Sequence, residues 1–264
     1  MDASPLKLFA LRLSEAARAE TMARWSAGIA AENKADAGHE FDPVTEADRE
    51  AERALRRLIE AEYPDHGISG EEFPDRPAQG RLSWSLDPID GTRSFICGMP
   101  SWVTLIALLE DGAPIIGVID APRLDELYLG DCETTILMTG GTERRLSASG
   151  CRRLSEAKFS TTDPFLFEGA EVEAFHALRS RVRTTRYGHD GYGYTRVAAG
   201  TIDLVAEARL SPYDLNALVP VVRGAGGVIG DWSGGGDFSA GQVLAAATPE
   251  LFEEAVALLQ GAAA

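Results

Sequence analysis

Two aspartates lie at the end of an apolar strand pattern in the segment Leu-Ser-Trp-Ser-Leu-Asp-Pro-Ile-Asp-Gly-Thr, residues 82–92. Asp87 and Asp90 flank Pro88 and Ile89, so a backbone with little freedom holds the two negative charges near each other. Their repulsion costs free energy unless a positive group lies between them. The segment therefore predicts a cation site at a rigid turn, to which the rest of the chain must supply further ligands.

The length and charge of the chain limit its architecture and its partners. A chain of 264 residues suits one large layered domain or two closely packed halves. The formal net charge of -16 repels nucleic-acid phosphates, so we expect no nucleic-acid partner. The same field repels a small phosphorylated substrate, and cations must neutralise any site that binds one.

The cysteines and the N-terminus favour a cytoplasmic protein. Cys97, Cys132 and Cys151 form no Cys-x-x-Cys pair, which is typical of free thiols in a reducing compartment. The N-terminal residues are acidic and amphipathic, unlike a signal peptide. No segment approaches the roughly 20 apolar residues that span a bilayer, so we expect no membrane segment.

Hydrophobic spacing predicts two helices in the first part of the chain. The first extends from about 4 to 31, and the second begins near Thr45 and ends before Pro64. Thr45 and Asp48 have the spacing of a capping box, in which each side chain bonds the other residue's backbone.

A series of strands follows between about 82 and 139. Asp111 and Gly112 separate two of them and predict a tight hairpin, hence antiparallel pairing. From about 155 onward strand and helix patterns alternate, which indicates a sheet covered by helices. The stretch from Gly140 to Arg153 is the best boundary between an N-terminal half, 1–150, and a C-terminal half, 151–264.

Four acidic clusters follow or end breaks marked by proline or glycine; they contain Asp48, Glu71 with Glu72, Asp87 with Asp90, and Asp214. Singly, each has a structural explanation, with Asp48 as a helix-cap partner, Asp90 as a turn residue and Asp214 as an N-cap. Together they favour a hard divalent cation, which prefers several carboxylate and carbonyl oxygens. The four histidines lack metal-ligand spacing, which disfavours zinc.

The residues around Asp90 suit a metal and a phosphate. Pro88 has no backbone donor and leaves the Ile89 carbonyl free to point inward. Gly91 permits a close backbone approach, and Thr92 can cap a short helix whose N-terminal amides would hold a phosphate oxygen. We therefore expect Gly91 and Thr92 to bind phosphate.

Four segments of the chain contain the acidic clusters: Trp-Ser-Leu-Asp-Pro-Ile-Asp-Gly-Thr, Ser-Gly-Glu-Glu, Pro-Val-Thr-Glu-Ala-Asp, and Pro-Tyr-Asp with a later Gly-Ala-Gly-Gly. They resemble the signatures of the inositol monophosphatase superfamily, whose members are magnesium-dependent, lithium-sensitive phosphatases. The resemblance extends from about Lys34 to Gly227. It implies an α/β (α+β) fold, a layered αβαβα sandwich with an antiparallel-rich N-terminal sheet and the site between the halves. It also implies a homodimer.

The resemblance further implies a set of site residues. The metal shell for two or three Mg²⁺ would be Glu71, Asp87, the Ile89 carbonyl, Asp90 and Asp214. The catalytic residues would be Thr92, Asp48 and Glu71, with Thr92 and Asp48 orienting the metal-bound water that attacks phosphorus. No covalent phosphoenzyme is required.

Within the superfamily the chain is most similar to histidinol-phosphate phosphatases, which implies hydrolysis of L-histidinol phosphate in histidine biosynthesis. Glu207 is at the position where family members contact the alcohol, and Asp190 is in Tyr-Gly-His-Asp-Gly-Tyr-Gly-Tyr. Two carboxylates would make charge-assisted contacts with the ammonium and imidazole groups. The alternatives are that Asp190 only caps a helix starting near Gly191 and that Glu207 only ends a strand at the surface.

Other residues have weaker assignments. His189 and Tyr192 or Tyr194 can contact an imidazole, and Lys34 and Arg93 can offset the phosphate charge. After the last motif, Asn216 and Arg223 depart from the pattern of many family members, whereas Tyr213 is shared with the histidinol-phosphate group.

Three rival functions remain open. An inositol monophosphatase, or a phosphatase of another small phosphomonoester, would keep the fold and the chemistry. A nucleotide 3'-phosphatase lacks an evident adenine cradle. A non-catalytic, metal-binding interaction protein is disfavoured because all five motif carboxylates and Thr92 are present.

Overall fold

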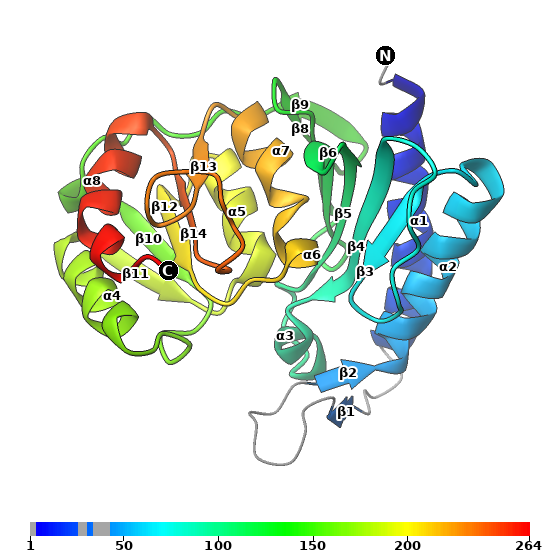
Figure 1. Cartoon of the computed structure of the whole chain (residues 1–264), viewed down its shortest axis with the longest axis horizontal. Helices are drawn as coiled ribbons and strands as arrows, with labels where there is room; N and C mark the ends of the chain where they lie inside the picture. The colour runs from blue at the N-terminus through cyan, green and yellow to red at the C-terminus, as the bar shows by residue number, and fades with distance from the viewer. Residues whose placement is uncertain (1–3, 26–30, 34–42) are drawn as a thin grey trace.

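Five layers of helices and sheets alternate through the molecule (Figure 1). The computed structural model describes residues 4–25, 31–33 and 43–264. Helices α1 and α2 cover one sheet, α5 and α7 lie between the two sheets, and α4 and α8 cover the other side. The expected αβαβα sandwich is confirmed.

The first outer layer consists of α1 (Ser4–Trp25) and α2 (Glu46–Glu62). Their apolar faces, which include Phe9 and Leu55, bury against the first sheet. The capping box of α2 is confirmed, because the Thr45 side chain accepts from a backbone amide and Asp48 accepts from the Thr45 amide at 2.8 Å.

The expected extension of the first helix to residue 31 is wrong. The helix ends at Trp25, and residues 31–33 form β1 (Ala31–Asn33), which pairs antiparallel with β2 (Pro43–Thr45). A strand ladder takes up the backbone groups that a helix would need for its own hydrogen bonds.

The first sheet has seven strands in chain order, β3 to β9. Their bounds are Gly67–Gly70, Leu82–Asp90, Val103–Glu110, Ala113–Ala121, Glu126–Gly130, Thr135–Thr139 and Thr142–Arg145. Only β3 and β4 pair in parallel. Asp111 and Gly112, with φ of 50° and 81°, make the predicted hairpin turn between β5 and β6.

Two strands of this sheet were not predicted. The edge strand β9 lies within the stretch that we assigned to the boundary, and its four residues, Thr-Glu-Arg-Arg, are all exposed. The other, β3, is short and ends in glycine. Neither has the apolar alternation from which a strand is predicted.

The second sheet has the order β11-β10-β12-β14-β13 and mixes parallel and antiparallel pairs. In chain order its strands β10 to β14 are Lys158–Thr161, Thr184–Tyr187, Leu204–Glu207, Val228–Gly230 and Val243–Ala246. Its outer face packs against α4 (Ala170–Arg181) and α8 (Pro249–Leu259). The division of the chain at residue 150 falls between the two sheets and stays a prediction.

The remaining elements include the short helices near the site. They are α3 (Thr92–Ile96), α5 (Asp190–Ala198), α6 (Pro212–Leu215) and α7 (Leu218–Gly224), together with 3₁₀ turns at Leu154–Glu156 and Gln260–Ala262. In the alternating second part of the chain, the pattern over residues 214–224 predicts one helix; the structure has two, α6 and α7, separated at Asn216 and Ala217.

Glycines on the first sheet let the middle layer approach closely. A Cβ on Gly117 would lie 2.2 Å from the Ala217 carbonyl oxygen, and one on Gly130 would lie 2.5 Å from the Pro220 carbonyl oxygen. Backbone atoms cannot move aside as a flexible side chain can. The distance between the first sheet and α7 therefore depends on these glycines.

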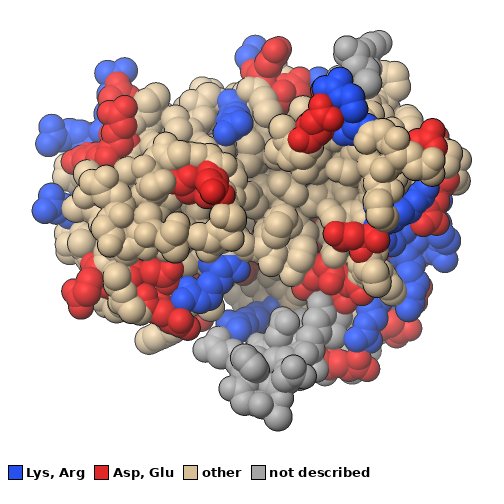
Figure 2. Space-filling view, viewed as in Figure 1, with Lys and Arg blue, Asp and Glu red and all other residues tan. Residues whose placement is uncertain are grey.

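The charges on one face and the apolarity of the helices can be described directly. Acidic and basic side chains are interspersed on the face in Figure 2, and the basic ones form no continuous band there. Among the helices of the described ranges, none combines the length and apolarity needed to cross a membrane.

We expect Gly117→Ala to lower the free energy of unfolding by about 1–3 kcal/mol, because the added methyl group overpacks the contact with α7. Urea denaturation of the two proteins gives this difference. The control is Gly80→Ala, since Gly80 has no neighbour near an added Cβ. Equal midpoints for Gly117→Ala and the unaltered protein would contradict this account of the packing.

Candidate active site

A bulge at the end of β4 brings Asp87 and Asp90 together. The pairing of β4 with β5 shifts register between these two residues, where Pro88 offers no backbone donor. The Ile89 amide donates to the Asp87 carboxylate at 3.1 Å, and the Pro88 carbonyl accepts from the Thr104 hydroxyl at 2.7 Å. The turn is therefore fixed by hydrogen bonds on both sides.

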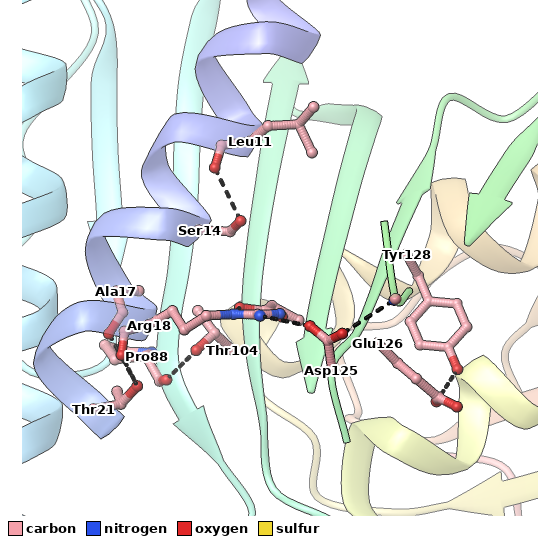
Figure 3. A network of polar contacts seen from close by, with 12 residues as sticks. Leu11, Ser14, Ala17, Arg18, Thr21, Pro88, Thr104, Asp125, Glu126 and Tyr128 are labelled. Carbon is pink, nitrogen blue, oxygen red and sulfur yellow. Dashed lines mark hydrogen bonds and ion pairs between the residues drawn. The ribbon is translucent and has the colours of Figure 1, made fainter. Parts of the chain in front are cut away.

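A polar network extends behind this turn (Figure 3). Thr104 is paired in register with Asp120 on β6, and Asp120 accepts two hydrogen bonds from Arg18 of α1 at 2.5 and 3.0 Å. Arg18 also donates to Asp125 at 3.2 Å. Figure 3 shows the Arg18 side chain crossing the strands beside the contact between Thr104 and Pro88. The outer helix layer is thus linked through β6 and β5 to the turn that contains Asp87 and Asp90.

Three carboxylates converge here from two elements, β4 and α6. Asp87, Asp90 and Asp214 each offer an oxygen, and these oxygens lie within 4.8 Å of one another. Asp214 is the third residue in the capping box of α6 and accepts from the Ser211 amide at 2.7 Å, so Ser211, rather than Asp214, is the N-cap. Asp90 accepts from the Gly191 amide of α5 at 2.5 Å.

Burial and mutual repulsion raise the pKa of each of these carboxyls. Burial is the largest cause for all three, followed by the charge of Glu71 for Asp87 and that of Asp190 for Asp90. The pKa of Asp214 is raised to about 7. Asp87 is buried, and Asp90 and Asp214 are partly buried. An all-oxygen cluster with excess negative charge has the donor chemistry that Mg²⁺ prefers, so these residues fit that ion.

Two further carboxylates approach from the first sheet and from α2. Glu71 follows β3, its amide donates to the Leu86 carbonyl at 3.3 Å, and it lines the cavity described below. Asp48 is buried, and burial raises its pKa to about 6. One Asp48 oxygen accepts from the Thr45 hydroxyl and amide, while Oδ1 has no hydrogen-bond partner among the described residues. Asp48 therefore retains an acceptor.

The role of Thr92 in the turn differs from the helix cap that we expected. Gly91, with φ of 84°, is the N-cap of α3, and Thr92 is the first helical residue and not the cap. The Thr92 hydroxyl donates to the Ile89 carbonyl at 3.0 Å, which leaves that oxygen a second lone pair. Within the described part of the chain no hydrogen bond joins Thr92 to Asp48, so their joint orientation of water stays a prediction.

A cavity of about 300 Å³ opens between the two halves beside this cluster. Its lining comes from both halves and includes Glu71, Asp90, Gly91, Thr92, Arg93, Thr162, Asp190, Tyr194, Glu207, Arg209 and Asp214. Asp87 and Asp48 are buried next to it and do not line it. The volume is at the lower end of the range for small-molecule sites.

The alternative structural explanations for Asp190 and Glu207 do not hold. Asp190 makes no capping hydrogen bond, and its carboxylate accepts from the Ser94 hydroxyl at 3.2 Å. Glu207 is 6% exposed and accepts from the Thr162 amide and hydroxyl, each at 2.8 Å. Burial raises the pKa of Asp190 to about 6 and that of Glu207 to about 8.

Of the three rings considered for substrate contact, only Tyr194 reaches the cavity. It is fully buried, and its hydroxyl has no partner in the part of the chain that the structure describes. Burial, and then the charge of Glu207, raises its pKa. Tyr192 donates to Glu126 at 3.0 Å, and His189 lies 2.8 Å from the Ser160 hydroxyl.

Lys34 and Arg93 were the two basic residues considered for the phosphate charge. Arg93 lines the cavity and lies 3.8 Å from Asp163, whereas Lys34 is outside the described residues. Sequence reasoning missed Arg209 and Thr162, which line the cavity from the ends of β12 and β10. Neither residue belongs to a motif, and only their positions just after predicted strands could have indicated them.

The profile of the inositol monophosphatase family matches residues 2–263, and the chain belongs to this family. It is therefore a phosphatase of the inositol monophosphatase superfamily, and enzymes of this family are metal-dependent.

Individual relatives differ in the activities that they are named for. The chain is 44% identical over 197 residues to the chloroplastic bifunctional phosphatase IMPL2 of Arabidopsis thaliana, covering 74% of this chain but only 56% of that relative. It is 36% identical to the histidinol-phosphatase of Chlorobaculum parvum, with 82% and 83% covered. A solved inositol monophosphatase from Zymomonas mobilis has a TM-score of 0.84 and 38% identity, with 98% and 99% covered.

The raised pKa of Asp214 makes the stability of the metal-free protein depend on pH. The folded carboxyl has a pKa of about 7, against an ordinary value of about 3.9, so it holds its proton more tightly than the unfolded one. Its contribution to stability therefore falls as pH rises from about 4 to about 7. We expect Asp214→Asn to raise the melting temperature in chelator at pH 8 by several degrees, with a smaller gain at pH 5.

Differential scanning fluorimetry with and without Mg²⁺ measures this difference. Mg²⁺ should stabilise the unaltered protein at pH 8 more than it stabilises Asp214→Asn. Asp75→Asn is the control, because it removes an exposed carboxylate of the same charge. A gain of equal size in both variants would point to net charge alone and would overturn the local explanation.

Proposed function

We propose that the protein is a Mg²⁺-dependent phosphomonoesterase that hydrolyses L-histidinol phosphate to L-histidinol and phosphate. The observation that carries the proposal is the presence of two further carboxylates, the half-buried Asp190 and the buried Glu207, in the same cavity as Asp90 and Asp214. A phosphate ester whose alcohol part is cationic matches this arrangement. The carboxylates around Asp90 and Asp214 would hold metal ions that bind the phosphate, and Asp190 and Glu207 would bind the positive charge of the alcohol part.

The proposed metal shell is made by residues from both halves. Glu71, Asp87, Asp90, Asp214 and the Ile89 carbonyl would hold two or three Mg²⁺ ions. When bound, Mg²⁺ neutralises the phosphoryl oxygens, lowers the pKa of water and stabilises the leaving oxygen in an in-line displacement.

The chain's own groups would orient the reactants. The backbone at Gly91 and Thr92 holds a phosphate oxygen at the start of α3, and Arg93 lies at the same wall of the cavity. The Thr92 hydroxyl and the unpartnered oxygen of Asp48 orient the attacking water, with Glu71 beside them. The reaction then proceeds without a covalent phosphoenzyme.

The alcohol part would be recognised through charge. An ammonium or imidazolium group near Asp190 and Glu207 would favour their ionised forms, which burial otherwise disfavours. The ring of inositol carries no positive charge, so its hydroxyl groups could donate to these carboxylates but would not add the attraction of a cation. The Tyr194 hydroxyl can accept a further hydrogen bond from the ammonium or imidazolium group. The histidinol-phosphatase relative supports this choice.

Inositol monophosphate is the second candidate substrate. The Zymomonas mobilis relative, which matches nearly the whole chain, is described as an inositol monophosphatase. A non-catalytic role fits less well, because the motif carboxylates and Thr92 lie together around one cavity. The homodimer and the cytoplasmic location remain part of the proposal.

Phosphate release from L-histidinol phosphate, inositol 1-phosphate and a nucleotide 3'-phosphate, each with Mg²⁺ and with chelator, tests the proposal. We expect a preference for L-histidinol phosphate of at least about tenfold in kcat/KM and no turnover in chelator. If inositol 1-phosphate is preferred, the chemistry stands and the substrate is wrong. If no ester is hydrolysed, the enzymatic proposal itself fails.

Specificity should depend on the two substrate carboxylates. We expect Glu207→Gln and Asp190→Asn each to lower kcat/KM for L-histidinol phosphate by about 10- to 100-fold, because each removes a charge-assisted hydrogen bond. Activity on a phosphomonoester whose alcohol part is uncharged, such as p-nitrophenyl phosphate, should change by less than about threefold. Comparable losses on both esters would show that these residues act on the metal site or the fold instead.

A further inference from the structure

Glu52 is a charged side chain buried beneath the site without lining the cavity. It is 0% exposed and lies on α2, one helical turn after Asp48. One carboxylate oxygen accepts from Nε of Arg56 at 2.7 Å, and the other accepts from the backbone amide of Glu72 at 2.8 Å. Glu52 thus binds the residue that directly follows Glu71.

Arg56 extends the same contact along the loop. Its two terminal nitrogens donate to the Phe73 carbonyl at 2.9 Å and the Pro74 carbonyl at 3.0 Å. Glu52 and Arg56 together therefore hold one backbone group of each of three consecutive residues, 72 to 74. The backbone that follows Glu71 cannot shift without breaking these hydrogen bonds.

The residue before Glu71 also contacts this carboxylate. A Cβ on Gly70 would lie 2.4 Å from the nearer Glu52 oxygen, so the strand end lies directly against the carboxylate. Glu71 is thus bracketed by Gly70, which packs against Glu52, and by Glu72, which Glu52 hydrogen-bonds. The backbone position of Glu71 is set from both sides by one side chain.

Stability alone is a weak reason for this arrangement. Removing a carboxylate and a guanidinium from water costs several kcal/mol, and well-packed apolar residues of the same volume are often equally stabilising. Glu52 and Arg56 make directional hydrogen bonds to the loop of Glu71, which an apolar pair could not make. Such supporting contacts orient ligand side chains in metal sites.

We propose that Glu52 is a positioning residue that, with Arg56, fixes the backbone of Glu71 and thereby directs its carboxylate toward the Mg²⁺ site. This inference rests on the proposed function. It also makes α2 the element that places two site carboxylates, Asp48 directly and Glu71 through Glu52.

Glu52→Gln tests the proposal. The glutamine amide keeps one acceptor oxygen but turns an NH₂ group toward a donor, so it cannot accept from both Arg56 and the Glu72 amide. We expect Mg²⁺ binding, measured by isothermal titration calorimetry without substrate, to weaken by about 10- to 100-fold. The Mg²⁺ concentration for half-maximal phosphatase activity should rise equally, while KM at saturating Mg²⁺ changes by less than about threefold.

Glu50→Gln is the matched control, because Glu50 is on the same helix and pairs with the half-exposed Arg53. It should bind Mg²⁺ like the unaltered protein. Arg56→Gln is the second variant and removes the hydrogen bonds to the Phe73 and Pro74 carbonyls. It should also weaken Mg²⁺ binding. This variant tests the proposal if Glu52→Gln does not fold.

Unchanged Mg²⁺ affinity in a folded Glu52→Gln or Arg56→Gln variant would overturn the inference. So would a loss of thermal stability in chelator with Mg²⁺ affinity intact, which would show that the role of the pair is structural. A different result, in which the unaltered protein neither binds Mg²⁺ nor hydrolyses a phosphate ester, would count against the proposed function and not specifically against Glu52.

Discussion

The mutual repulsion of buried carboxylates is the constraint on which the site depends. Asp87, Asp90 and Asp214 lie within 4.8 Å of one another, and burial raises the pKa of each. Each accepts one backbone hydrogen bond, from Ile89, Gly191 and Ser211 respectively. These hydrogen bonds offset only part of the repulsion between the carboxylates, so the arrangement favours the binding of a cation.

The layered architecture makes this convergence possible. The end of β4 belongs to the first sheet, α5 and α6 approach it from the second half, and Glu207 ends β12 of the second sheet. The middle helix layer can approach the first sheet closely because Gly117 and Gly130 have no side chain. The distance between the layers thus helps to set the distance between the proposed metal ligands and the proposed substrate residues.

Elements with strong local signals were predicted from the sequence. Asp111 and Gly112 define the hairpin between β5 and β6 through their backbone conformation, and the capping box at Thr45 starts α2. Elements that form by strand pairing without an apolar pattern were not predicted: β9 is polar and pairs with β8, and residues 31–33, at the end of the predicted first helix, pair as β1 with β2. Local propensity does not contain that information.

The sequence by itself determined which residue types form the proposed metal site, because Asp87, Pro88 and Asp90 restrict one another within a single turn. Only the tertiary structure decided the roles that depend on burial. It placed Asp190 and Glu207 in the cavity, selected Tyr194 over Tyr192, and brought Glu52 against the loop of Glu71. The physical reason is that spacing along the chain fixes local backbone geometry, whereas desolvation and contacts between distant residues arise only when the layers pack.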